Sequence, residues 1–248
     1  MTATPQRVQD PSIRELIDLP EECISINEAH AASHAYIACA FYTPNYLPQV
    51  SALKRSLDAH GISYFLKRYE KQPTWEEGTR LKPVFLSYCL EKFPDNDILY
   101  LDADAVVRKP LEFFDQVTAD VSFLLTPKRK HNRNYLRLTA ATVLIRKTPG
   151  GRRFVETWKT AGSGAAKLMH DEDLLHRIFP KLAGISVALL PTSYSKIFDE
   201  SGEDTAIEQF QASRGQFKPS YALRKTRRIA LIVAAMAALG LAAWTAMS

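Results

Sequence analysis

Short apolar runs alternate with longer amphipathic segments along the central part of the chain. The run at residues 36–42 predicts a strand, and Gly61 predicts the end of the helix that follows it. Residues 62–66 and 98–101 predict two more strands. The helices between them are predicted from apolar residues at helical spacing, namely Leu47, Val50, Leu53 and Leu57 in the first and Leu81, Phe85, Tyr88, Cys89 and Phe93 in the second. This alternation predicts an α/β fold with a mostly parallel sheet flanked by helices, in which ligands bind beyond the carboxyl ends of the strands.

The pattern continues in the second half of the chain. Strands are predicted at residues 121–125, 142–145 and 185–190, and helical segments at residues 154–158 and 174–179. Between the first two of these strands we expect a basic surface loop that contains Lys128, Arg129, Lys130, Arg133 and Arg137. The polar residues 1–33 carry at most one short helix, at residues 13–19, and are interpreted as an accessory segment. The folded domain is therefore expected to span residues 34–223.

The C-terminal segment has a different composition. Residues 229–247 carry no charge, and a helix of this length, at about 1.5 Å per residue, spans the roughly 30 Å hydrocarbon core of a bilayer. It is preceded by four cations, Arg224, Lys225, Arg227 and Arg228. Because such cations remain on the cytoplasmic side, residues 224–248 predict a basic segment and a single-pass C-terminal membrane anchor, with the domain facing the cytoplasm. The alternatives for this segment are a buried core helix and an interfacial helix.

Composition excludes several classes of protein. Hydrophobic residues make up 46% of the chain and charged residues 24%, so a disordered or fibrous chain is excluded. Cys23, Cys39 and Cys89 have the spacing of neither a disulfide framework nor a zinc site. The net charge of +5 comes mostly from the basic segment before the anchor, so the domain is nearly neutral and nucleic acid is not an expected partner. The N-terminus lacks the apolar stretch of a signal peptide.

An acidic pair follows the third predicted strand. In extended backbone, residues two apart point the same way, so Asp102 and Asp104 are expected to project together at the edge of the sheet. Carboxylate oxygens suit Mg²⁺ or Mn²⁺, which complete their coordination with water and substrate phosphates. The pair therefore predicts a divalent cation that binds together with a diphosphate. The alternative is that the two acids only begin a turn.

The order of motifs resembles the GT-A nucleotide-diphospho-sugar glycosyltransferases, especially the family 8-like and related DxD enzymes. The resemblance covers about residues 35–220 and rests on Lys82-Pro83, the ILYLDADAVV strand, Trp158, Asp171-Glu172-Asp173-Leu174-Leu175, Ile207-Glu208 and Ala212-Ser213-Arg214. It implies a GT-A, Rossmann-like fold and a metal-dependent transfer of sugar from a nucleotide-diphosphate donor, with a UDP-sugar favoured. The acceptor would be the hydroxyl group of a carbohydrate, a lipid-linked molecule or another compound.

The resemblance also implies roles for individual residues on the donor side. Asp102 and Asp104, with Ala103 between them, would hold the metal and the donor diphosphate. Tyr42 and Thr43, directly after the first strand, would border the nucleoside.

Basic and acidic residues elsewhere in the motifs complete the implied site. Arg80 and Lys82 would reach the base or the phosphates, where a cation offsets the charge of the leaving group. Asp171 and Glu172 would face the donor sugar or the acceptor as catalytic residues. The alternative for Arg80 and Lys82 is a solvated helix start, and for the two acids a capping role at a helix N-terminus.

One motif departs from the family pattern. Family 8-like enzymes have a late segment with a metal-binding histidine and a lysine that contacts the diphosphate. Here Ala212 stands at the position of the histidine, or Gln209 does so in the looser pattern of related groups, whereas Lys218 is retained. The third protein ligand of the metal is therefore left open.

Two other functions compete with sugar transfer. A haloacid-dehalogenase-like phosphatase also has a strand followed by two aspartates, and Thr126 and Asp204 are similar to its later motifs only in residue type. That motif normally opens its domain, whereas here a strand and helix pattern precedes it. The second alternative is a non-catalytic nucleotide-sugar-binding domain, which the missing histidine favours.

Overall fold

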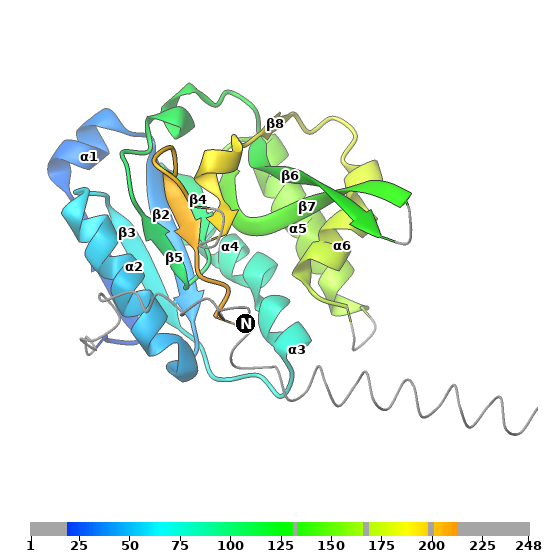
Figure 1. Ribbon diagram of the computed structural model, residues 1–248, viewed down its shortest axis with the longest axis horizontal. Helices are drawn as coiled ribbons and strands as arrows, with labels where there is room; N and C mark the ends of the chain where they lie inside the picture. Colours follow the sequence, from blue (N-terminus) through cyan, green and yellow to red (C-terminus); the bar gives the residue numbers. More distant parts are fainter. Residues whose placement is uncertain (1–18, 131–132, 166–168, 198–200, 213–248) are drawn as a thin grey trace, which may run out of the picture. The chain divides into compact units, whose positions relative to one another are not determined.

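Seven strands form the main sheet in the computed structural model, which describes residues 19–130, 133–165, 169–197 and 201–212 (Figure 1). Their order across the sheet is β1-β3-β2-β4-β7-β6-β8. The strands are β1 (Glu22–Ser25), β2 (Tyr36–Tyr42), β3 (Tyr64–Arg68), β4 (Asp97–Leu101), β6 (Val121–Lys130), β7 (Arg133–Ile145) and β8 (Val187–Leu189). A smaller sheet with the order β5-β10-β9 contains β5 (Ala105–Val107), β9 (Lys196–Ile197) and β10 (Ile207–Gln209).

Five of the seven strands run in the same direction. β2 pairs in parallel with both β3 and β4, as the alternation of strands and helices predicts. β7 is antiparallel to β4 and to β6, so β6 and its parallel neighbour β8 have the direction of β4. The edge strand β1 and the inserted strand β7 run the other way. The prediction of a mostly parallel sheet in an α/β fold is confirmed, and the carboxyl ends of β2, β3 and β4 lie along one edge.

Helices cover both faces of the main sheet (Figure 1). Alternate residues of β2 belong to two separate cores, because Ala38 packs in the same cluster as Leu53 of α2, and Cys39 in the same cluster as Phe85 of α4. A sheet that is buried on both faces forms a three-layer arrangement. The helices are α1 (Glu28–Ser33), α2 (Leu47–Ala59), α3 (Trp75–Thr79), α4 (Leu81–Lys92), α5 (Pro149–Ser163) and α6 (Asp171–Ile178), with short 3₁₀ helices at Pro44–Tyr46, Glu112–Gln116, Phe179–Lys181 and Thr192–Tyr194.

Two sequence-based boundaries differ from the structure. The segment 1–33 contains β1, which pairs with β3, so the main sheet begins before residue 34. The expected basic loop is wrong, because these residues belong to a hairpin whose strands β6 and β7 pair as far as Lys130 and Arg133. The reason is a strand pattern on β7, where Leu138 and Ala140 are buried on one face between polar positions.

The predicted membrane anchor at residues 229–247 and most of the predicted helix at residues 13–19 lie outside the described residues. Within the described ranges, no helix has the length and apolar composition needed to cross a bilayer.

Candidate active site

The acidic pair lies in a tight turn between the two sheets. β4 ends at Leu101, and the N–H of Ala105 donates a hydrogen bond of 2.9 Å to the carbonyl oxygen of Asp102 before β5 enters the smaller sheet. Ala103 is buried inside this turn, whereas Asp102 and Asp104 are partly exposed. The expectation of extended backbone here is therefore wrong, because the chain must change direction to leave the main sheet. The turn stands at the carboxyl end of a central strand, where an α/β sheet binds its ligands.

Tyr46 lies near the acidic turn. It lies in the 3₁₀ helix just after β2, and burial together with the negative charges of Asp104 and Asp102 raises its pKa well above the ordinary value. Tyr42 ends β2 as a buried residue, and the Thr43 hydroxyl donates to Asn45 Oδ1 at 2.7 Å. Sequence reasoning selected Tyr42 and Thr43 but missed Tyr46, although its position in the loop after the first strand was a usable signal.

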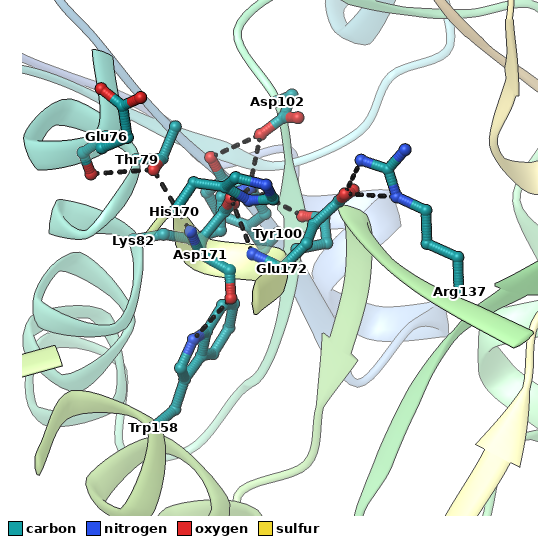
Figure 2. A network of polar contacts seen from close by, with 11 residues as sticks. Glu76, Thr79, Lys82, Tyr100, Asp102, Arg137, Trp158, His170, Asp171 and Glu172 are labelled. Atoms are coloured by element: carbon teal, nitrogen blue, oxygen red, sulfur yellow. Dashed lines mark hydrogen bonds and ion pairs between the residues drawn. The ribbon is translucent and has the colours of Figure 1, made fainter. Parts of the chain in front are cut away.

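Lys82 connects the acidic turn of Asp102 and Asp104 to a second acidic group, which consists of Asp171 and Glu172 (Figure 2). It is the second residue of α4 and its side chain is 5% exposed. Its Nζ lies 3.0 Å from Asp102 Oδ1, 2.6 Å from Asp171 Oδ2 and 2.9 Å from the carbonyl oxygen of Ala140. Burial alone would lower the pKa of Lys82, but the charges of Asp102 and Asp171 outweigh it and raise the pKa above its ordinary value. Lys82 is therefore a buried cation shared by two carboxylates.

Asp171 is fixed from several sides at the start of α6. Its N–H donates to Thr79 Oγ1 at 3.3 Å, its carbonyl oxygen accepts from Trp158 Nε1 at 3.3 Å, and its Oδ1 accepts from the N–H of Glu172 at 2.9 Å. Burial raises the pKa of the carboxyl group, but the ammonium of Lys82 and the ring of His170 lower it to about 2. Asp171 is thus a charged, rigidly held carboxylate 7% exposed.

Glu172 points to a different partner. Arg137 of β7 donates from both Nε, at 2.7 Å, and Nη2 to Glu172 Oε2 (Figure 2). Burial and the charge of Asp171 raise the pKa of Glu172 in spite of this arginine. The same hairpin is joined to α6 by a second bond, from the N–H of Leu138 to His176 Nε2 at 3.1 Å. The hairpin of β6 and β7, which the sequence suggested as a solvated loop, therefore contacts α6 beside the second acidic group.

His170 lies beside the second acidic group, as the residue directly before α6. Its Nδ1 lies 3.5 Å from Asp171 Oδ1 and its Nε2 lies 3.2 Å from Asp173 Oδ2, while its ring contacts Trp75 at a centroid distance of 5.3 Å. Burial lowers the pKa of His170, but the hydrogen bond and charge of Asp171 outweigh this and raise it.

A group whose pKa is raised by folding stabilises the protein most when it is protonated in both states. The contribution of His170 is therefore complete below its unfolded pKa of about 6.5 and is lost as the pH rises through the higher folded pKa. We expect His170→Gln to lower the free energy of unfolding more at pH 5.5 than at pH 9. Urea denaturation of both proteins at the two pH values measures this difference, and an equal loss at both would contradict the assignment.

Comparison with known proteins identifies the fold. No protein-family model matches the sequence, and no curated protein matches it. Among solved structures, the chain is similar to a glycosyltransferase involved in the glycosylation of the major capsid of PBCV-1, with a TM-score of 0.57 and 13% identity over 73% of this chain and 97% of that one. The chain has a glycosyltransferase fold.

The glycosyltransferase GlyE of Streptococcus pneumoniae TIGR4 is also found, with a TM-score of 0.49 and 13% identity over 71% of this chain and 55% of that chain. The GT-A-like fold expected from the sequence motifs is confirmed. A closer relation to family 8 stays a prediction.

The glycosyltransferase fold places Gln209 beside the acidic turn. In the register of β10 it lies opposite Ala105, and its Nε2 donates to Thr142 Oγ1 at 3.1 Å, on the strand next to β4. Gln209 is 4% exposed, and its Oε1 has no hydrogen-bond partner among the described residues. A buried amide oxygen without a donor is costly, and it is a ligand that a hard divalent cation accepts.

The described residues contain no cluster of three or more His, Cys, Asp and Glu side chains arranged to hold a metal. Two carboxylates and an amide oxygen fit a cation that completes its coordination with water and substrate oxygens, which is common for Mg²⁺. These donor atoms are therefore of the chemical type that suits the divalent cation implied by the sequence resemblance.

Arg80 and Lys218 are the remaining predicted residues. Arg80 donates to the carbonyl oxygen of Ala165 at 3.3 Å and lies 3.9 Å from Glu77, and Lys218 is outside the described residues. The residues that the phosphatase interpretation needs bond to other partners, because the Thr126 hydroxyl contacts Thr139 and Asp204 pairs with Lys196 at 3.1 Å. The fold and these contacts favour the glycosyltransferase interpretation.

Proposed function

We propose that this protein is a metal-dependent glycosyltransferase that moves a sugar from a nucleotide-diphosphate donor to an acceptor hydroxyl. The observation that carries the proposal is the acidic turn of Asp102 and Asp104 at the carboxyl end of β4, within a glycosyltransferase fold. A second acidic group from a distant segment, Asp171 and Glu172, is joined to it through Lys82. A UDP-sugar is the favoured donor, on the sequence resemblance.

Asp102 and Asp104 would hold Mn²⁺ or Mg²⁺, and Gln209, opposite Ala105 in the strand register, would offer its amide oxygen, unpartnered among the described residues, as a further ligand. When bound, the cation supplies positive charge that offsets the charge of the diphosphate leaving group. The protein's own contribution is positional. Tyr42 is the last residue of β2, and Thr43 and Tyr46 follow it in the loop where a nucleoside at the sheet edge would lie.

Asp171 would supply a fixed negative charge near the donor sugar or the acceptor. Because its pKa is about 2, it is ionised at neutral pH and its oxygens act as hydrogen-bond acceptors. Such a carboxylate orients an acceptor hydroxyl or stabilises positive charge that develops on the sugar. Glu172 is less suited to this role because burial and the charge of Asp171 raise its pKa, which favours the neutral form.

The test is a donor screen with the full-length chain purified in detergent. Each nucleotide-sugar is offered with Mn²⁺, and release of the nucleoside diphosphate is measured before and after chelation by EDTA; a phosphomonoester is offered in parallel. Release that EDTA abolishes supports the proposal. Phosphate release from the monoester supports a phosphatase, and donor binding without turnover over a broad acceptor panel supports a binding domain.

We also propose that residues 229–247 anchor the protein in a membrane with the catalytic domain on the cytoplasmic side. The support is the uncharged segment itself and the basic residues 224–228 before it. We expect the full chain to remain in the membrane fraction after alkaline carbonate extraction and a chain that ends at residue 223 to be released. Release of both would contradict the anchor. A lipid-linked acceptor would suit an enzyme held at this surface.

A further inference from the structure

Lys82 has no hydrogen-bond donor left for a substrate. An ammonium group has three N–H bonds, and three protein acceptors surround this one, namely Asp102 Oδ1, Asp171 Oδ2 and the carbonyl oxygen of Ala140. The side chain also lies over the ring of Tyr100, 4.9 Å from its centroid, and the hydroxyl of Tyr100 donates to the same Asp102 Oδ1 at 2.9 Å. The role that the sequence suggested for Lys82, direct contact with the donor phosphates, would require one of these bonds to break.

The position of this cation affects any metal that binds the acidic turn. One oxygen of Asp102 is already engaged by a full positive charge at 3.0 Å and by a phenolic hydroxyl. A divalent cation at the same carboxylate would be repelled by Lys82 at short range and inside a partly buried site, where screening by water is weak. A diphosphate would reverse this balance, because its negative charge attracts both the metal and Lys82.

We propose that Lys82 is a positioning residue that keeps the metal affinity of the free acidic turn low, so that the cation binds together with the donor diphosphate and not before it. The inference rests on the proposed function and adds to it the order in which the charges assemble. The same ammonium lies 2.6 Å from Asp171, so binding of the metal and the diphosphate at the acidic turn is also coupled to the second acidic group.

The experiment measures Mn²⁺ binding directly, by electron paramagnetic resonance of the free ion, with and without UDP. We expect the wild-type chain to bind Mn²⁺ weakly alone and tightly with UDP. Lys82→Met should bind Mn²⁺ alone about tenfold more tightly or better, and UDP should improve this binding less than in the wild type. A lysine with a purely structural role predicts the opposite sign, since loss of local structure weakens metal binding.

Two variants keep the result interpretable. Lys82→Arg retains the charge and should keep the weak binding of the wild type. The double variant Lys82→Met with Asp171→Asn removes one cation and one anion, so the net charge of the network is the same as in the wild type and the extra buried negative charge of the single variant is avoided. It should still bind Mn²⁺ more tightly than Asp171→Asn alone, and it provides the measurement if the single variant does not fold.

The matched control is Lys92→Met on the same helix. Lys92 Nζ pairs with Glu22 Oε2 at 3.0 Å, away from the acidic turn, so its loss should leave Mn²⁺ binding unchanged. If the wild type binds no Mn²⁺ with UDP or with the nucleoside diphosphate of any donor in the screen, the proposed function fails. If it binds Mn²⁺ with UDP but the Lys82 variants bind Mn²⁺ alone no more tightly than their references, only the inference about Lys82 fails.

Discussion

Asp104→Asn should lower kcat/KM for sugar transfer by about a thousandfold, while the free energy of unfolding changes by about 1 kcal/mol or less. The large effect is expected because the substitution removes one of two carboxylate ligands, and stabilisation of a leaving group by a metal is worth several kcal/mol. A loss of about 4 kcal/mol corresponds to three powers of ten in rate. The small effect on stability is expected because Asp104 is partly exposed and lies in a turn.

The control for this prediction is Asp204→Asn. Asp204 is also a surface aspartate, and its contact is an exposed ion pair with Lys196 between β9 and β10. We expect kcat/KM to stay within about twofold of the wild type, since exposed pairs contribute little. Activity that survives Asp104→Asn but is lost in Asp204→Asn would remove the acidic turn from the mechanism.

The main sheet could be predicted where short apolar runs alternate with amphipathic segments along the chain. β2, β3 and β4 follow from apolar runs, and the helices between them from one apolar face. β1 could not be found in this way because polar contacts, as well as apolar ones, stabilise it at the edge of the sheet. Glu22 accepts from Lys67, Tyr88 and Lys92, and these bonds, that of Lys67 foremost, lower its pKa to about 2.

Strands were predicted at residues 121–125 and 142–145, but their continuation into the long hairpin of β6 and β7 was missed for a different reason. Pro127 and the basic residues after it are typical of a loop, yet Pro127 pairs with Leu136 inside the hairpin. Proline is tolerated in this strand because β8 pairs with β6 only between Val121 and Phe123. Beyond Phe123 that side of β6 has no strand neighbour in the described residues, so a missing N–H there breaks no ladder bond.

The sequence predicted which residues belong to the candidate site, but not the contacts that join them. Asp102, Asp104 and Asp171 could be selected because acids beside apolar segments require a partner or solvent. The link through Lys82 could not be predicted, because it joins positions far apart in sequence and depends on how α5 packs against both α4 and α6. Nor could Asp171 be distinguished from Glu172, because the two are adjacent residues of the same helix and differ only in the partners that the fold brings to them.

Asp171 and Glu172 have different neighbours in the structure, and the second large effect expected on activity follows from this difference. Asp171→Asn should lower kcat by about a hundredfold or more, because it removes a fixed charge at the proposed reacting centre. The amide oxygen can still accept the N–H of Glu172, so α6 should keep its first turn. Glu172→Gln should lower kcat by about tenfold or less, since burial and the charge of Asp171 raise the pKa of Glu172 and favour a neutral form that glutamine resembles.

Steady-state kinetics with the donor found by screening, at saturating Mn²⁺, measure both variants, and thermal unfolding of each shows whether the fold is retained. A larger loss of kcat in Glu172→Gln than in Asp171→Asn would exchange their roles. The Arg137 pair would then be a device that orients the catalytic carboxylate, and the hairpin of β6 and β7 would belong to the reacting centre. If both variants keep full kcat, the second acidic group serves only to hold Lys82 and the start of α6, and catalysis rests on the acidic turn.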